Sequence, residues 1–288
     1  MRLAEFGTFY RFENSGELFG LMRVRGMTLN DAHIFCSMEQ LKAEFIKAVI
    51  LVEKVYKDLN LKDFWYRLSL HDPKDKEKYG DKPKLWKASE KAIKDALKEA
   101  KIEYKEVVGD AAFYGPKLDV QIPNALGKDE TVSTIQIDFY QPENFNLEYI
   151  GEDGKQHPVV MIHRGVISTL ERMVAFLAEQ YQGLWPFWLA PTQVMIVPIS
   201  DRNLKYGQKV LERLKSENIR VELDKRGETM QAKIRDAAAQ KIPYMLIVGD
   251  REEKENSVSV RTRNGKNLGA MGLEEFLTKI KKEIENKT

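Results

Sequence analysis

The chain has 288 residues, 43% of them hydrophobic, so it can bury a sizeable core, and we expect two domains. A single cysteine, Cys36, excludes a disulfide framework and indicates a reducing cytoplasm. No apolar run approaches the roughly 18 residues of a membrane span, so we expect no membrane partner. The net charge of +2, taken alone, argues against a dominant nucleic-acid patch, so binding to nucleic acid would need an uneven distribution of charge.

The first predicted element is a β-hairpin. Alternating residues over 2–10 predict one strand, and the apolar run 18–24 predicts its antiparallel partner after a polar turn. Arg11 lies just before the turn, and Arg23 and Arg25 follow it. Guanidinium groups bind phosphate as planar forks, so three arginines at one hairpin indicate a site for an anionic ligand. Ordinary surface charge is the alternative.

Helices and strands then alternate in the pattern. We expect a second hairpin over 102–140, on which Thr134 and Gln136 share one face because side chains alternate along a strand. A plain structural hairpin with a polar outer face is the alternative. The remaining expected elements of this part are a helix over 38–59, a strand over 64–70, a solvated loop over 71–84, a helix over 86–101 with Trp86 in the core, and hairpin strands over 118–122 and 132–139.

Residues 159–182 predict an apolar strand followed by a helix. The strand leads to His163, and a histidine in an apolar strand is more often a core residue than a metal ligand. The helix contains Arg172, and an arginine in this setting usually pairs with a carboxylate or faces solvent. We expect its apolar stripe to comprise Ile167, Leu170, Val174 and Leu177.

A stretch with two prolines and several aromatic residues, 184–191, indicates a domain boundary, and we expect domains over 1–187 and 188–288. From Ala190 onward Lys and Arg number 20 against 15 Asp and Glu, as expected of a part that approaches a phosphate backbone, although solvated helix faces would produce the same excess. Alternation predicts a small α/β sheet there, with strands over 193–198, 220–223 and 244–248, an edge strand over 258–263, and helices over 202–216, 229–239 and 273–285.

The hairpin sequence FYRFENSGELFGLMRVRGMTLNDAHIF closely resembles motif 2 of the class II aminoacyl-tRNA synthetases, and its SGELFGLMRVRG and DAHIF parts are similar to threonyl-tRNA synthetase. FYGPK at 113–117, the strand TIQIDF at 134–139 and the strand–helix at 159–182, as motif 3, match as well. Three stretches of the last third, DKRGE, KIR and IPYMLIVGD, resemble the class IIa anticodon-binding domain. The implied fold is an α+β catalytic domain, an antiparallel sheet with helices that is truncated at its N-terminus, followed by an α/β anticodon-binding domain.

The resemblance implies ATP-dependent activation of threonine to threonyl-adenylate and transfer to tRNA(Thr), with Mg²⁺ accompanying ATP and with Zn²⁺ holding threonine. The implied catalytic residues are Arg11, Arg23 and Arg172, and ATP would be bound by these three with Glu13, Met27 and Thr134. Threonine would be bound by Asp31, Tyr114 and Gln136, zinc by His33 and His163, and the tRNA anticodon by Arg235, Lys241, Glu252 and Arg261.

The match begins inside the family's catalytic domain. It has no counterpart of motif 1, which forms the family's homodimer interface, of the editing and N-terminal domains, or of the cysteine that is the third zinc ligand. We therefore expect weak zinc binding, with water or Cys36 as the other candidate ligands, and loss of that dimer interface. Leu29 stands where the family has a glutamine and cannot donate a hydrogen bond, which puts amino-acid selectivity in question, whereas Met27, in the place of a phenylalanine that stacks on adenine, can still cover the ring face. The alternative hypothesis is a catalytically weak or inactive tRNA-binding fragment or paralogue with the same fold.

Overall fold

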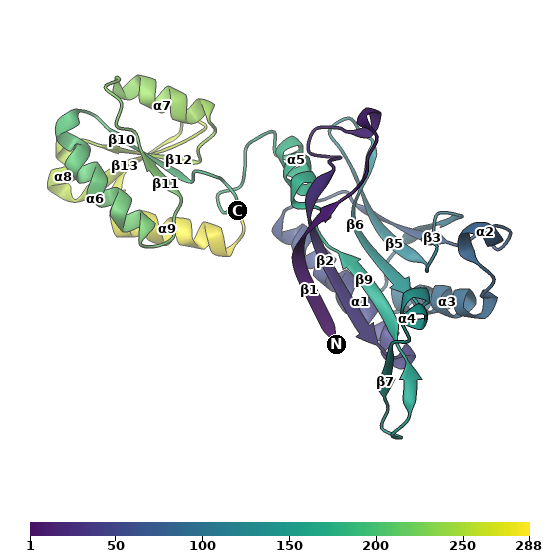
Figure 1. Cartoon of the computed structure of the whole chain (residues 1–288). Helices are drawn as coiled ribbons and strands as arrows, with labels where there is room; N and C mark the ends of the chain where they lie inside the picture. The colour runs from purple at the N-terminus through teal and green to yellow at the C-terminus, as the bar shows by residue number, and fades with distance from the viewer. The chain divides into compact units, whose positions relative to one another are not determined.

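The computed structural model describes all 288 residues and divides them into two compact units, Met1–Gln180 and Tyr181–Thr288 (Figure 1). Each unit has its own sheet and its own helices. The boundary expected after residue 187 lies a short way into the second unit.

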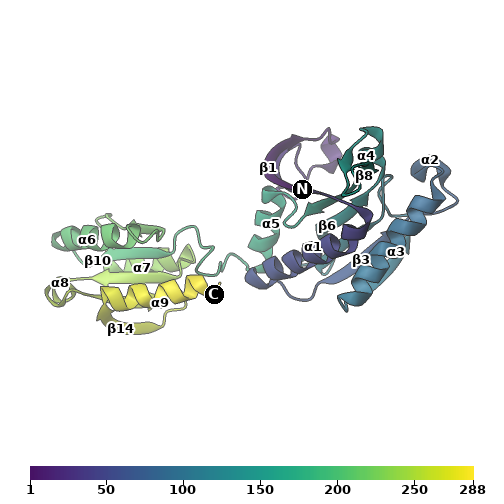
Figure 2. The same ribbon diagram turned by 90° about the horizontal axis from the view of Figure 1, so that it is seen from below.

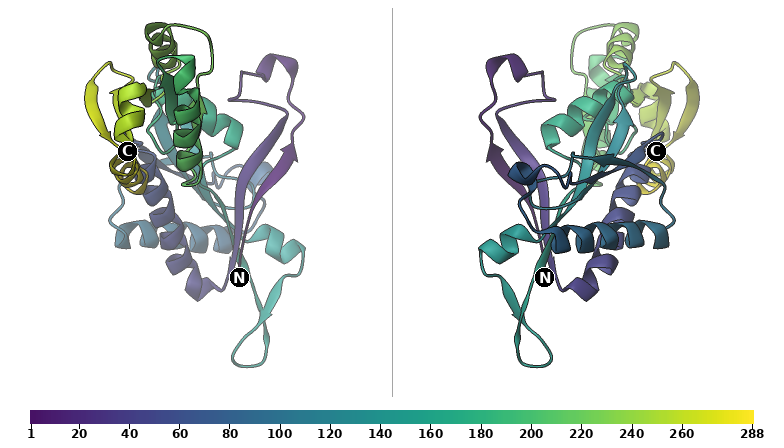
Figure 3. Two further views of the ribbon diagram at one scale, coloured as in Figure 1. Left: turned by 90° about the vertical axis from the view of Figure 1, so that its left-hand side faces the viewer. Right: turned by 90° about the vertical axis from the view of Figure 1, so that its right-hand side faces the viewer.

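A seven-stranded sheet organises the first unit. Neighbouring strands are antiparallel, as the resemblance to an antiparallel catalytic sheet implies, except that β3 (Trp65–Leu70) and β4 (Tyr104–Val108) are parallel. Two further strands, β7 (Glu148–Ile150) and β8 (Gln156–Pro158), form a separate hairpin that projects from the unit (Figure 3). The strand order across the sheet is β1 (Arg2–Tyr10), β2 (Gly26–Cys36), β9 (Val160–Gly165), β6 (Asp129–Asp138), β5 (Lys117–Pro123), β3 (Trp65–Leu70) and β4 (Tyr104–Val108).

One face of this sheet is apolar and the other polar. Along β6, Ile135 and Ile137 are fully buried, whereas Thr134 and Gln136 point to the opposite side because side chains alternate along a strand. The apolar face packs against the long helices α1 (Met38–Asp58) and α3 (Pro83–Glu99), as expected from their periodicity (Figure 2). The polar face is therefore left to carry the site.

The predicted hairpin forms, but the position of its second strand was wrong. β1 pairs with β2, which begins only at Gly26, and the run 18–24 is part of a long loop with a short 3₁₀ turn, η1 (Ser15–Glu17). The run folds back on itself because Gly20 adopts a φ of +47° and the Arg23 amide donates to the Phe19 carbonyl. The side chains of Leu18, Phe19 and Leu21 stay exposed, whereas Met22 and Val24 are half-buried.

Three other expectations in this unit need correction. The loop expected over 71–84 contains a helical turn, α2 (Lys76–Tyr79), and Tyr79 is buried against Trp86, itself a core residue as predicted. Strand β4 and the short helix α4 (Tyr140–Asn144) were not predicted. Helix α5 (Leu170–Gln180) buries Met173, Phe176 and Leu177, while Leu170 and Val174 of the predicted stripe are exposed.

The small sheet covered by helices that was predicted for the second unit forms, but it is a mixed sheet of five strands in place of the four expected, with helices on both faces (Figure 1). The strand β13 (Ser257–Thr262) was predicted to lie at the edge of the sheet, and this was wrong, because the glycine-containing β14 (Asn267–Gly272) pairs with its outer side. Helices α6 (Leu204–Lys215) and α9 (Leu273–Glu285) pack on one face and α7 (Met230–Ala239) on the other. The other strands are β11 (Val221–Leu223), β10 (Val194–Pro198) and β12 (Tyr244–Val248), and the helices are α6 (Leu204–Lys215), α7 (Met230–Ala239), α8 (Asp250–Glu255) and α9 (Leu273–Glu285), with a 3₁₀ turn η2 (Asp201–Asn203).

Candidate active site

Two adjoining hollows lie on the polar face of the seven-stranded sheet. They share Arg11, Leu29, Ser168 and Arg172, so these four residues form a common wall. The larger hollow, about 280 Å³, is also lined by the predicted residues Asp31, Tyr114, Thr134, Gln136 and His163. The smaller, about 60 Å³, is also lined by the predicted residues Glu13, Arg23 and Met27.

The hairpin loop builds the smaller hollow through ion pairs. Glu13 is buried, and its Oε2 accepts from Arg23 Nε at 3.0 Å. Arg25 Nε donates to the Glu13 carbonyl at 3.0 Å, so both arginines after the loop hold its first half in place. Glu13 Oε1 remains open to accept a hydrogen bond, and the exposed Arg11 side chain has no partner in the chain. Such groups suit a ligand that offers an amino donor and an anion.

Helix α5 supplies the third arginine of the site. Thr169 caps this helix by accepting the Arg172 amide at 3.1 Å, which fixes the first turn at the hollows. Arg172 Nε donates to the Met22 carbonyl at 3.0 Å, so the guanidinium is tied to the hairpin loop. Its two terminal nitrogens remain available for an anion.

The junction before α5 is tied to β2. Ser168 has a φ of +54°, an unusual conformation for a residue other than glycine. Its carbonyl accepts the Asn30 amide at 3.0 Å, and Glu171 accepts the Thr28 amide at 3.0 and 3.1 Å. These bonds hold the common wall together from two elements far apart in the sequence.

The larger hollow contains a connected row of polar groups from β6 and from the turn before β5. Tyr114 donates its hydroxyl hydrogen to Gln136 Oε1, and Gln136 Nε2 donates to Thr134 Oγ1 at 3.2 Å. Burial, followed by the nearby carboxylates of Asp138, Asp31 and Asp119, raises the pKa of Tyr114 to about 12, so its hydroxyl stays protonated at neutral pH. The row can position a small polar ligand.

The two predicted zinc ligands are brought together. His33 and His163 are opposite each other in register on β2 and β9, with ring centroids 4.6 Å apart. His163 Nε2 lies 2.8 Å from Asp138, and His33 Nδ1 lies 3.5 Å from Asp31, so each ring keeps one nitrogen away from its carboxylate. A carboxylate on the second nitrogen is typical of histidines that bind metals.

A third zinc ligand is not present, because no three His, Cys, Asp or Glu side chains of the chain are grouped so as to hold a metal ion. The suggestion of Cys36 as a candidate zinc ligand was wrong. Cys36 is three residues from His33 on the same strand, so its side chain points to the opposite face of the sheet. Burial raises the pKa of the Cys36 thiol to about 11, which also disfavours the thiolate that zinc needs. Protein zinc sites use three or four protein ligands, so the residues here do not complete one.

The residues predicted to meet the anticodon lie in the second unit, on and around the α7 side of its sheet. Arg261 pairs with Met245 across β12 and β13, and Met245 packs in the α7 core, so Arg261 shares that face. Arg235 is an exposed residue of α7, and Lys241 follows that helix and donates to the Gln182 carbonyl at 2.5 Å.

Glu252 serves the fold of the second unit. It is buried, with one carboxylate oxygen accepting the Gly249 amide at 3.0 Å and the other accepting the Ser259 hydroxyl at 2.8 Å. It therefore caps α8 and ties that helix to β13. The role of Glu252 in RNA binding stays a prediction, as do the roles of the other three.

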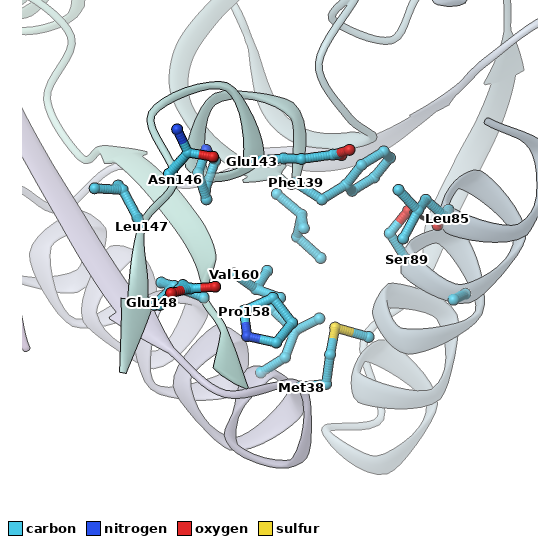
Figure 4. Close-up of a pocket in the computed structure, with 15 residues that line it drawn as sticks. Met38, Leu85, Ser89, Phe139, Glu143, Asn146, Leu147, Glu148, Pro158 and Val160 are labelled. Atoms are coloured by element: carbon cyan, nitrogen blue, oxygen red, sulfur yellow. Dashed lines mark hydrogen bonds between the residues drawn. The ribbon is translucent and has the colours of Figure 1, made fainter. Parts of the chain in front are cut away.

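A separate pocket of about 240 Å³ lies on the helical side of the first unit. Met38 of α1, Leu85 of α3, Phe139 and Val160 surround it, with Glu148 at its margin (Figure 4). Its lining is mostly apolar, and its polar residues do not form a connected row as in the larger hollow.

Among the helices of the chain, none is both long and apolar enough to cross a membrane.

Several residues of the site were missed by the sequence patterns. Asn30 and Ser168 line the larger hollow and are bonded to each other through the backbone, and Arg164 lines it beside His163. Asp119 lies behind it and binds Thr134. The sequence around Asp119 gives no local signal of a role in the site, whereas Asn30 and Arg164 could have been found because each adjoins a predicted site residue.

Sequence comparison identifies both units. The tRNA synthetase class II core domain (G, H, P, S and T) matches residues 1–181, and the anticodon binding domain matches residues 193–283. The chain is 53% identical over 286 residues to Threonine–tRNA ligase 1 of Bacillus subtilis (strain 168) and 54% identical over 285 residues to Threonine–tRNA ligase of Geobacillus sp. (strain WCH70). Each match covers 99% of this chain and 44% of the relative, so the chain spans less than half the length of these relatives.

Solved structures agree with the sequence relatives. The RNA binding domain of threonyl-tRNA synthetase from Cryptosporidium parvum Iowa II superposes with a TM-score of 0.91 at 35% identity, over 98% of this chain and 70% of that one. Prolyl-tRNA synthetase from Cryptosporidium parvum, complexed with L-proline and AMP, has a TM-score of 0.70 at 18% identity over 100% of this chain and 56% of that one, and shares the fold. Because both units match, the chain belongs to the threonyl-tRNA synthetase family of class II aminoacyl-tRNA synthetases.

Proposed function

We propose that the chain activates threonine with ATP and transfers the threonyl group to tRNA(Thr). The observation that carries the proposal is the common wall: Arg11 and Arg172 face both hollows, so one ligand in each would meet at the two guanidinium groups. The smaller hollow suits the nucleotide base beside Glu13 and Met27, and the larger suits an amino acid beside Asp31 and the polar row. Arginine forks at the junction suit the phosphate between them.

The proposed chemistry needs no protein nucleophile. A threonine carboxylate oxygen attacks the α-phosphorus of ATP, the bond to the β-phosphate oxygen breaks, and pyrophosphate leaves with that electron pair. A ribose hydroxyl at the tRNA 3′ end then attacks the threonyl carbonyl, and AMP leaves. The side chains of Arg11, Arg23 and Arg172 would position the phosphate and stabilise the charge that develops on its oxygens. ATP would arrive with Mg²⁺ bound to its phosphates.

The test is threonine-dependent exchange of pyrophosphate into ATP, followed by charging of tRNA(Thr), with the full chain. We expect exchange that requires an amino acid and is fastest with threonine. The proposal would be overturned by an exchange rate that does not depend on which amino acid is supplied, or by the absence of both exchange and charging.

A second candidate is a tRNA-binding protein with little or no turnover, favoured by the incomplete metal site around His33 and His163. If two imidazoles are the only protein ligands, chelator-washed protein should hold far less than one zinc per chain. Metal analysis beside the exchange assay separates the candidates. A low zinc content with absent exchange and retained tRNA binding supports the second candidate, whereas brisk exchange rules it out.

A further inference from the structure

Asp119 is buried behind the larger hollow and connects to its polar row. It lies on β5 opposite Thr134 of β6 and is 1% exposed. Its Oδ2 is 2.9 Å from Arg67 Nη2 and 3.0 Å from Lys117 Nζ. Its Oδ1 accepts the Thr134 hydroxyl hydrogen at 2.8 Å. The two cations compensate the buried charge, so the bond to Thr134 is an additional link from this ion cluster to the site.

A carboxylate accepts hydrogen bonds and cannot donate one, so Asp119 gives the row a direction. The Thr134 hydroxyl must donate to Asp119, which leaves its oxygen to accept from Gln136 Nε2. The Gln136 amide is thereby oriented with Oε1 toward Tyr114, whose hydroxyl donates to it.

We propose that Asp119 is a positioning residue for the amino-acid substrate. By fixing the direction of the row it leaves a lone pair of the Tyr114 oxygen and the second amide hydrogen of Gln136 for a ligand in the larger hollow. These are one acceptor and one donor, the pair that an amino acid with an ammonium and a carboxylate group requires. The inference rests on the proposed function, because it assigns the larger hollow to that substrate.

The test is Asp119→Asn in the full chain. Asparagine has nearly the same shape, but its amide group can donate to Thr134, so the row loses its single direction. We expect the threonine KM in pyrophosphate exchange to rise about tenfold, while the ATP KM changes by less than about twofold. The matched control is Asp110→Asn, which removes a second carboxylate 3.3 Å from Arg67 without touching Thr134. We expect both KM values of the control to stay within about twofold of the wild type.

An unchanged threonine KM in Asp119→Asn, or equal rises in both KM values, overturns the inference. If that variant does not fold, Thr134→Val keeps the ion cluster and removes the hydroxyl, and an unchanged threonine KM then overturns it. Calorimetry with a non-hydrolysable threonyl-adenylate analogue replaces KM by Kd where turnover is too slow to measure. A wild type that neither turns over nor binds the analogue refutes the proposed function and this inference together, whereas an active wild type with unaffected variants refutes only this inference.

Discussion

The polar face of the seven-stranded sheet and the α7 side of the five-stranded sheet use their charged residues differently. In the first unit, Arg11 has no partner in the chain, and Arg172 is bonded through Nε alone, which leaves its terminal nitrogens open. In the second unit, Glu252 has both carboxylate oxygens occupied and Lys241 is bonded to a backbone carbonyl, while Arg261 has no such bond. A charged residue for which the family resemblance implies a binding role can therefore either contact a ligand or stabilise the fold. Its hydrogen bonds within the chain distinguish the two roles, because a residue that contacts a ligand must keep some of its donor or acceptor atoms unoccupied.

The largest effect should come from Arg172→Ala, because it removes a charged contact from both hollows and the bond to Met22. One charge-assisted contact contributes roughly 1.5–3 kcal/mol, so ATP affinity by calorimetry should fall about tenfold to a hundredfold. Arg2→Ala is the matched control, since it removes an exposed guanidinium that pairs only with Glu44. Unchanged ATP affinity in Arg172→Ala would assign this arginine to the fold alone.

Glu252→Ala should act on stability. It leaves the Gly249 amide and the Ser259 hydroxyl without their partner, which costs about 1–3 kcal/mol in a buried setting. Denaturant unfolding of the full chain, followed by a probe in the second unit, measures this loss, and Glu253→Ala on the exposed side of α8 is the control. A variant of full stability that binds tRNA poorly would reverse this assignment and give Glu252 a direct contact.

Arg261→Ala should act on RNA binding with little change in stability. If Arg261 contacts a phosphate, the slope of log affinity for tRNA against log salt should become shallower by about one. Lys209→Ala is the control of equal charge, because Lys209 is exposed on α6, on the opposite face of the same sheet. Equal effects of the two variants would indicate general electrostatic attraction in place of a defined contact.

The smallest effect should be seen in the pH dependence of the second unit. A hydrogen bond from Arg226 lowers the pKa of the Asp224 carboxyl below its usual value. The stability from this pair is therefore present above the ordinary aspartate pKa of about 4 and is lost as the pH falls further. Thermal melts of Arg226→Ala should lie below the wild type at pH 7 and approach it in acid. A constant difference across pH would contradict this role, and Arg251→Ala, whose pair with Glu255 is exposed, is the control.

Periodicity predicted most elements of the fold because burial on one side imposes it. The helix α9 and strand β3 lie almost where the pattern placed them. The exceptions are segments whose composition points to the wrong structure. The run 18–24 is apolar like a strand but closes into a local turn at Gly20, and β14 contains glycines that disfavour strands yet pairs with β13 around a bulge.

The residues of the candidate site came from the resemblance more than from physical patterns. The sequence shows arginines around a hairpin, and from this an anionic-ligand site follows, but it does not show that Arg172 joins them from a helix about 150 residues away. Asp119 could not be predicted for a related reason. Its partners Thr134, Lys117 and Arg67 meet only when three strands pair in register.

The common wall between the two hollows also has a thermodynamic consequence. Because Arg11 and Arg172 face both hollows, a ligand in one changes the charge that the other experiences. An anionic nucleotide and an amino acid should therefore alter each other's affinity. Thermodynamic linkage requires that the factor by which the nucleotide changes the affinity for the amino acid equals the factor by which the amino acid changes the affinity for the nucleotide. Leu29 and Ser168, the uncharged members of the wall, separate the ligands sterically, so the coupling would pass through the guanidinium groups.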